Sequence, residues 1–146
     1  MIPLLEQAWG AVEVVALSLG GVVDASTLPG WLAERDGEVV GLLTYLAADD
    51  LVDIVTINAF AGGGVGTALV EALVEDVRGS AARIRVTTTN DNTRALRFYQ
   101  RAGFRLTALR PGAVAAARLR KPEIPETGAD GIPIRDEIEL EMEISP

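Results

Sequence analysis

The sequence predicts an α/β fold organised around a mixed sheet, and three observations support this prediction. An apolar run at 51–57 breaks into a glycine cluster, and a helical pattern begins directly afterwards at Val65. Before this run, the turn dipeptides at 36–37 and 49–50 separate strand-like stretches and predict antiparallel pairing. The apolar stretch 83–89 follows the helix, so the centre of the chain is predicted to be strand, helix, strand.

The first half of the chain is predicted to consist mainly of strands. β-branched residues favour a strand at 12–17. The runs 31–35 and 38–47 flank an Asp-Gly dipeptide, which favours the tight turn of a β-hairpin. The strand at 51–57 then leads into the glycine cluster.

The second half is predicted to alternate strands with helices. Asp91 or Asn92 is expected to cap a helix at 93–102, because both residue types accept hydrogen bonds from free N–H groups at a helix start. Gly103 is expected to end this helix. A strand at 104–110 follows.

The stretch 111–131 predicts an insertion into an otherwise single domain that spans residues 1–146. Pro111 suits the first turn of a short helix that runs to Lys121, and turn residues dominate the remainder. The segment is interpreted either as a lid over a bound acceptor or as a surface decoration that covers a sheet edge. The sequence favours neither interpretation over the other.

The final stretch, 132–144, alternates apolar and charged residues and predicts a half-buried strand. Its other face is acidic, and we expect that face to be solvated and to protect a sheet edge from pairing. Asp136 falls on the apolar face, where a carboxylate needs a partner. It is expected either to bind a substrate ammonium group or to pair with Arg110 or Arg118.

Composition narrows the range of functions. The 146 residues carry 13 Lys and Arg against 21 Asp and Glu, a net charge of −8, which argues against nucleic-acid binding. The chain has no Cys and no His, so the usual thiolate and imidazole groups are absent and no metal site is expected. No membrane-spanning run or secretory signal is recognised, so a cytoplasmic protein without membrane partners is expected. A homodimer is compatible with the sequence.

The glycine cluster suits an anionic ligand. N–H groups at a helix start lack intrahelical partners, and glycine lets a phosphate approach them closely. A nucleoside triphosphate loop would need a Lys after the glycines, and a dinucleotide loop would need a third glycine where Leu69 stands. Two interpretations remain, the pyrophosphate loop of acyl-CoA-dependent N-acyltransferases and a turn without a ligand.

A second motif favours the first of these interpretations. The sequence NDNTRALRFYQRAGF, residues 90–104, resembles the second signature of the GNAT superfamily of acetyl-CoA-dependent N-acetyltransferases. The residues in register are Asn92, Ala95, Tyr99, Gly103 and Phe104. One position of the glycine loop departs from the family pattern, because Ala61 stands where Arg or Gln is usual.

The resemblance implies a GNAT-like fold, a central and mostly antiparallel sheet flanked by helices, whose central strands splay apart to admit the pantetheine arm of acetyl-CoA. Backbone groups of β-strand residues in such a gap can pair with pantetheine amides, as an added strand would. The residues implied to bind the cofactor are Val55, Thr56, Ile57, Gly62, Gly63, Gly64, Val65, Gly66, Thr67, Asn92, Ala95 and Phe98.

The resemblance also implies the chemistry, in which acetyl-CoA donates an acetyl group to a primary amine of a small molecule or peptide that attacks directly. Tyr99 matches the general-acid tyrosine of the family; the alternative is a core aromatic. Asp53 is a candidate base or a polar residue at a strand end, and Tyr45 either lines the acceptor cavity or packs within its strand. The rival function is a non-catalytic acyl-CoA-binding sensor or partner module on the same fold.

Three arginines also recur on the second predicted helix. Arg94, Arg97 and Arg101 are three and four residues apart and therefore lie near one helix face. They are interpreted either as ligands of the cofactor's 3′-phosphate or as a solvated helix face, and solvated faces are the commoner of the two.

Overall fold

The structure is a computed structural model that describes residues 13–16, 21–24, 29–35, 38–59 and 64–144. The chain forms two compact units. The first unit comprises residues 1–14, 24–84 and 143–146, and the second comprises residues 15–23 and 85–142. Each unit is described by itself below.

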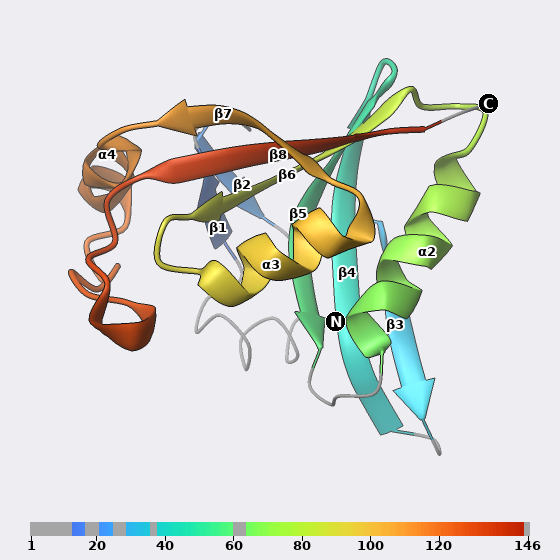
Figure 1. Ribbon diagram of the computed structural model, residues 1–146, viewed down its shortest axis with the longest axis horizontal. Helices are drawn as coiled ribbons and strands as arrows, with labels where there is room; N and C mark the ends of the chain where they lie inside the picture. Colours follow the sequence, from blue (N-terminus) through green and yellow to red (C-terminus); the bar gives the residue numbers. More distant parts are fainter. Residues whose placement is uncertain (1–12, 17–20, 25–28, 36–37, 60–63, 145–146) are drawn as a thin grey trace. The chain divides into compact units, whose positions relative to one another are not determined.

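Five described strands come first, and helices and strands then alternate along the rest of the chain (Figure 1). Six strands form one sheet in the order β3-β4-β5-β6-β8-β7, and β1 and β2 form a separate pair. The bounds are β1 Glu13–Ala16, β2 Gly21–Asp24, β3 Gly30–Arg35, β4 Glu38–Ala48, β5 Leu51–Ala59, α2 Val65–Val77, β6 Arg83–Thr89, α3 Thr93–Ala102, β7 Arg105–Arg110, α4 Ala113–Arg120, the 3-10 turn η3 Ala129–Gly131, and β8 Glu137–Glu143.

The first unit is an antiparallel meander of β3, β4 and β5, against which the helix α2 packs. Gly41 in β4 permits this packing. A Cβ atom at position 41 would lie 2.5 Å from Val65 Cγ1 and 3.0 Å from Leu69 Cδ1, both on the first turns of α2. Since Val65 and Leu69 are buried, the glycine fixes how closely the start of α2 approaches the sheet.

A β-bulge interrupts the ladder between β4 and β5. Thr44 is paired with Thr56 and Tyr45 with Ile54, so Val55 is an extra residue in β5. Successive residues of a regular strand point to opposite faces, and an extra residue reverses this alternation. The bulge therefore changes which side chains of β5 share a face.

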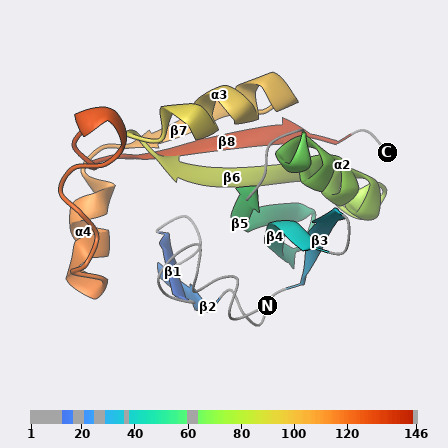
Figure 2. The ribbon, with the colours of Figure 1, turned by 90° about the horizontal axis from the view of Figure 1, so that it is seen from below.

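In the second unit, β8 lies between β6 and β7, and α3 contacts β7 (Figure 2). Asn92 caps α3, because its Oδ1 accepts a hydrogen bond from the Ala95 N–H at 3.2 Å. Gly103 ends the helix in a left-handed conformation with φ of 110°. These cap positions and the helix bounds agree with the sequence expectation, in which Asp91 was the alternative cap.

The expectation for the last strand was wrong in three respects. β8 begins at Glu137 rather than at 132, and β7, not β8, is the outermost strand of the sheet at this end. The acidic face is also only partly solvated, since Glu137 is 4% exposed and Glu139 is 8% exposed, whereas Glu143 is exposed. Each carboxylate pairs with arginine from a neighbouring strand, Glu137 with Arg110 and Glu139 with both Arg85 and Arg110.

The short helix of the inserted stretch is present but starts later than predicted. α4 begins at Ala113, and Gly112 in a left-handed conformation, not Pro111, precedes its first turn. The Ala113, Val114 and Ala117 side chains are buried, which gives α4 one apolar face. The segment beyond α4 contains η3 and returns the chain to β8.

Candidate active site

The first unit places an uncapped helix start directly after a strand. Gly64, with φ of 82°, precedes α2 and makes no side-chain cap. The first helical hydrogen bond in this turn runs from Ala68 N–H to Gly64 O at 2.9 Å. The backbone N–H groups of Val65, Gly66 and Thr67 precede it and are the groups that can receive an anion. The predicted residues Gly62 and Gly63, with Ala61, lie outside the described residues.

The polar side chains of β5 gather on one face of the first unit. Asp53 pairs in register with Leu46, while Thr56 pairs with Thr44. Because Leu46 and Thr44 are two residues apart on β4, and because Val55 is bulged, Asp53 and Thr56 share a face. Without the bulge their separation of three residues would put them on opposite faces.

Two of these side chains are already engaged. The Thr56 hydroxyl is hydrogen-bonded to the Thr44 hydroxyl at 2.7 Å, and both residues are buried. Asp53 is 8% exposed and interacts with a polar or charged neighbour. Any ligand contact at Thr56 therefore falls to its backbone, and Asp53 is held in place by its partner.

Asn58 supplies a donor on the same strand face that the sequence analysis did not identify. It pairs in register with Leu42, two residues from Thr44, and so lies on the face of Thr56. Its Nδ2 is buried and has no hydrogen-bond partner in the described part of the chain. A buried amide without a partner is costly, so this donor is suited to a ligand acceptor.

Tyr45 lies on the other face of the first unit, toward α2. Its hydroxyl donates a hydrogen bond to Asp76 Oδ2 at 3.2 Å. Partial burial, and then the hydrogen bond and charge of Asp76, raise the pKa of the Tyr45 hydroxyl. The structure does not bring Tyr45 together with Asp53, and this contact favours the interpretation of Tyr45 as a residue that packs its strand against α2.

In the second unit, Tyr99 occupies the buried face of α3. The residue is 5% exposed, and its ring meets Phe98 and Phe104 edge-on, with ring centroids 5.5 and 5.6 Å away. Burial raises the pKa of the Tyr99 hydroxyl well above its ordinary value of 10.0. Burial therefore favours the neutral phenol, and the hydroxyl is protonated at neutral pH.

The other predicted cofactor residues of the second unit are distributed around α3. Asn92 is exposed, with its Oδ1 used in the helix cap, whereas Ala95 and Phe98 are half-buried. Ala95 lies one helical turn before Tyr99, so both occupy the same side of α3. Ala95 thus lies close to Tyr99 along the helix, while the Asn92 side chain caps the helix start.

Asp136 has a structural partner that was not predicted. Its Oδ1 accepts a hydrogen bond from the Gly112 N–H, just before α4, at 2.9 Å. Arg110 pairs with Glu137 and Arg118 with backbone carbonyls, so neither expected arginine pairing is present. The carboxylate thus anchors the start of α4.

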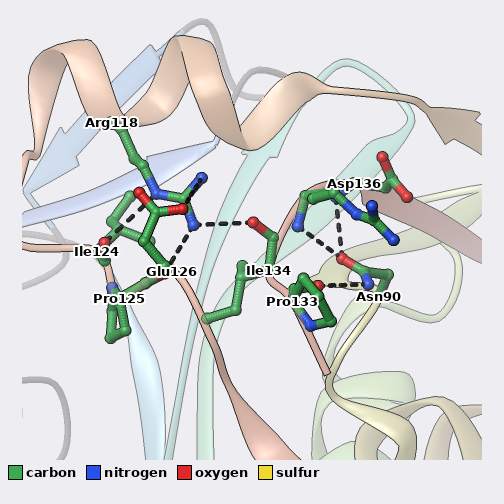
Figure 3. Close-up of polar contacts among 9 residues, drawn as sticks. Asn90, Arg118, Ile124, Pro125, Glu126, Pro133, Ile134 and Asp136 are labelled. Carbon is green, nitrogen blue, oxygen red and sulfur yellow. Dashed lines mark hydrogen bonds and ion pairs between the residues drawn. The ribbon is translucent and has the colours of Figure 1, made fainter. Parts of the chain in front are cut away.

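The loop before α3 holds the returning segment by hydrogen bonds to its backbone (Figure 3). Asn90 Nδ2 donates to Pro133 O at 2.8 Å, and Asn90 Oδ1 accepts from the N–H groups of Arg135 and Asp136 at 2.9 and 3.0 Å. The neighbouring Asp91 accepts from the Ala129 N–H at 3.2 Å. These bonds join the segment to the α3 start.

Arg118 of α4 holds the same segment from its other side (Figure 3). Its guanidinium donates to Pro125 O at 2.7 Å and to Ile134 O at 2.8 Å, with a longer bond to Ile124 O at 3.4 Å. The Glu126 carboxylate lies 3.9 Å away. Hydrogen bonds to its backbone thus fix the segment at both α4 and the α3 start, and whether it serves as a lid or as a surface decoration stays a prediction.

Comparison with known proteins decides the family. The family described as "Acetyltransferase (GNAT) family" matches residues 12–104, which include both the start of α2 and the whole of α3. The chain belongs to the GNAT acetyltransferase family. The sequence resemblance and the predicted fold class are thereby confirmed, and the enzyme class of the family is acyltransferase.

Relatives of this GNAT chain span nearly its full length. The uncharacterized protein YxbD of Bacillus subtilis (strain 168) is 39% identical over 142 residues, 95% of this chain and 88% of YxbD. An IAA acetyltransferase from Bacillus cereus ATCC 14579 has a TM-score of 0.68 at 28% identity, covering 79% of this chain and 77% of its own. A GNAT family acetyltransferase from Elizabethkingia anophelis, solved with acetyl-CoA bound, has a TM-score of 0.68 at 25% identity, covering 82% and 78%.

Two further features are absent from the described residues. They contain no helix long and apolar enough to cross a membrane. They also contain no group of three or more Asp, Glu, His or Cys arranged to hold a metal ion.

Proposed function

We propose that this GNAT protein transfers the acetyl group of acetyl-CoA to a primary amine of a small molecule or peptide. The observation that carries the proposal is the uncapped start of α2 directly after the bulged strand β5. A helix start of this kind offers N–H groups to a diphosphate. The acetyl-CoA bound in the Elizabethkingia anophelis relative supports the same choice of ligand.

The residues present fit the coenzyme. The free N–H groups of Val65, Gly66 and Thr67 would receive the diphosphate, together with the preceding glycines 62–64. Backbone groups of Val55, Thr56 and Ile57 would pair with the pantetheine amides. Bulges re-aim backbone groups near active sites, which suits Val55 to this task. The orphaned Nδ2 of Asn58 adds a donor for a pantetheine carbonyl.

By the family resemblance, Ala95 and Phe98 of α3 would contact the coenzyme, and Asn92 would cap the helix that carries them. Acetyl-CoA supplies the acetyl group as a thioester, which an amine attacks directly. The protein's own contribution is to position the reactants and to exclude water. A backbone N–H at the Val55 bulge would polarise the carbonyl oxygen.

Tyr99 is the proposed general acid. A tyrosine hydroxyl is protonated at neutral pH, and we propose that Tyr99 gives its proton to the departing sulfur as the thiolate forms. The edge-on contacts with Phe98 and Phe104 hold the Tyr99 ring in one orientation. Asp53 is the proposed base, acting directly or through a water molecule on the amine.

The acceptor side is proposed to include the wall formed by residues 121–136. This wall is joined to the α3 start by Asn90 and Asp91, and to α4 by Arg118. Among its carboxylates, Asp136 is the one proposed to bind an ammonium group, through the Oδ2 atom that its bond to the Gly112 N–H does not use. We further propose a cytoplasmic protein that works as a single domain, alone or as a homodimer.

A release assay tests this function against the rival, a non-catalytic acyl-CoA-binding module. The purified chain is incubated with acetyl-CoA and a panel of primary amines, and free CoA thiol is measured. Acetylation should require both reactants, and thermal stability should rise with acetyl-CoA and with CoA. Stabilisation without thiol release on any amine would favour the binding module. Absence of both effects would refute the proposal.

A further inference from the structure

The outermost strand of the second unit, β7, carries an exposed apolar pair. Among the described strands, β7 pairs with β8 alone, because it stands at the end of the strand order. Its side chains Leu106 and Leu109 are 55% and 59% exposed. A strand with one unpaired edge and exposed leucines is suited to association with another chain.

A bulge places both leucines on one face of the sheet. The register between β7 and β8 shifts at Thr107, which is an extra residue in β7. Leu106 and Leu109 are paired with Leu140 and Ile138, which are two residues apart on β8 and therefore share a face. In a regular strand, a separation of three residues would put the two leucines on opposite faces.

The sequence of β7 is nearly the same in both directions. It reads RLTALR, with an arginine and then a leucine at each end. If two copies paired antiparallel, Leu106 would lie opposite Leu109 of the second copy, and Arg105 opposite Arg110. Residues opposite each other in an antiparallel pair point to the same face. The bulge at Thr107 meets this condition, which a regular strand with this sequence would not.

The same bulge indicates which partner fits the edge. A bulge on an edge strand normally blocks pairing with a regular strand, since the two registers do not match. A second copy carries the same bulge, and a twofold axis beside Thr107 and Ala108 would bring the two bulges together. Both copies would then use the same surface, as is usual in homodimers. The matching occupant is therefore a second copy of this chain.

The charges at the ends of β7 are compatible with this pairing. Arg110 is bound by Glu137 at 3.0 Å and lies 3.5 Å from Glu139. At the other end of the strand, Arg105 is paired in register with Glu141. Each arginine thus has a carboxylate residue across from it on β8, which offsets the repulsion between Arg105 of one copy and Arg110 of the other.

We propose that two copies of this protein associate through β7, with their β7 strands antiparallel. The leucines of both copies form one apolar cluster at the twofold axis and shield one another from water. Because β7 has only six residues, the contact buries less than the roughly 1,600 Å² of a standard interface, and a dissociation constant on the order of 10 μM is expected. The dimer does not depend on acetyl transfer, since β7 contains no residue proposed to bind acetyl-CoA.

Sedimentation velocity of the full chain from about 1 to about 200 μM tests the dimer. Wild type should shift from monomer to dimer across this range. Leu106→Lys and Leu109→Glu should each weaken association at least about tenfold, because each places a charge against a leucine of the other copy. Leu119→Lys is the matched control, since Leu119 is an 86% exposed leucine of α4 in the same unit, and this variant should associate as wild type does.

Mixtures of variants test the antiparallel register. When Leu106→Lys is mixed with Leu109→Glu, the introduced lysine faces the introduced glutamate and the remaining leucines face each other, so association should return to about the wild-type level. When Leu106→Lys is mixed with Leu106→Glu, each charge still faces a leucine, and the mixture should stay monomeric.

A wild type that stays monomeric at about 200 μM would overturn the dimer and leave the proposed acetyl transfer untouched. A dimer that persists in both β7 variants, with melting curves like those of wild type, would place the contact elsewhere and also overturn the inference. Loss of association in Leu119→Lys would show unspecific hydrophobic association instead. Equal recovery in the two mixtures would contradict the antiparallel register.

Discussion

Arg110 and Glu137 face each other across the antiparallel ladder of β7 and β8. The Nε and Nη2 atoms of Arg110 both donate to Glu137 Oε1, at 3.2 and 3.0 Å. Arg110 Nη1 also lies 3.5 Å from Glu139 Oε2. The pair shows that the acidic side of β8 is an interior, charge-matched layer of the second unit.

This layer predicts an asymmetric response to mutation. Arg110→Ala should reduce the free energy of unfolding by about 3 kcal/mol, because it leaves Glu137 buried without its counter-charge. The double variant Arg110→Leu/Glu137→Leu should lose much less, since it removes both charges and fills their place. Urea denaturation of the two variants measures the difference. Equal losses of unfolding free energy in the two variants would show that an unpaired buried Glu137 is not what destabilises Arg110→Ala.

Gly41→Ala should destabilise the first unit and displace the start of α2. The new Cβ would meet Val65 Cγ1 at 2.5 Å, and overpacking of this kind costs about 1–3 kcal/mol. A displaced α2 start should also bind CoA more weakly. Adding Val65→Ala to Gly41→Ala removes the clashing methyl groups and should restore part of that affinity. Thermal melting and CoA titration provide the readouts, and a lack of rescue would argue against close packing as the cause.

Tyr99→Phe tests the proposed acid. The ring and its contacts with Phe98 and Phe104 remain, so the melting temperature and the affinity for CoA should change little. The kcat should fall by about 100-fold, the range expected for loss of a positioned proton donor. A core aromatic without a catalytic role would instead leave kcat unchanged.

Alkaline pH provides a second test of Tyr99. Its pKa is raised in the folded state, so folded protein keeps a proton that unfolded protein loses. Stability from this group is therefore complete below pH 10 and declines above it, by up to about 1.4 kcal/mol per pH unit. Tyr99→Phe should make the decline shallower, with Tyr45 still contributing in both proteins. Parallel slopes above pH 10 would contradict the burial of the hydroxyl.

Asn90→Ala should loosen the wall formed by residues 121–136. The variant removes three hydrogen bonds to the backbone of Pro133, Arg135 and Asp136, and leaves those groups without their partner. Amide hydrogen exchange of residues 134–136 should accelerate by at least about tenfold, while β3 and β4 of the first unit stay protected. Uniform acceleration across both units would indicate global destabilisation instead.

Most helices and strands were predictable because apolar periodicity, turn residues and helix caps indicate the same boundaries. Apolar periodicity and turn residues located all six strands of the large sheet and the helices α2 and α3, and the ends of α3 follow from Asn92 and Gly103. The family was predictable because two motifs occur in the right order. Strands, helix ends and motifs that depend on neighbouring residues could therefore be predicted from the sequence.

The errors arose where long-range pairing determines the outcome. Alternation in β8 indicated two faces, but whether Glu137 meets water or Arg110 depends on which strand lies beside it. The bulge at Val55 has no local signature, yet it decides which side chains share a face with Asp53. Asn90 and Arg118 bind backbone groups far along the chain, and such contacts leave no periodic pattern in a single sequence.

The position of β8 has a consequence for synthesis. The strand occupies the place between β6 and β7, which are both made earlier. Until residues 137–143 have been synthesised, β6 and β7 have no common partner, and the backbone N–H and C=O groups that will pair with β8 stay without it. A chain cut before Glu137 would leave β6 and β7 without their shared partner strand and would be a target for chaperones and proteases.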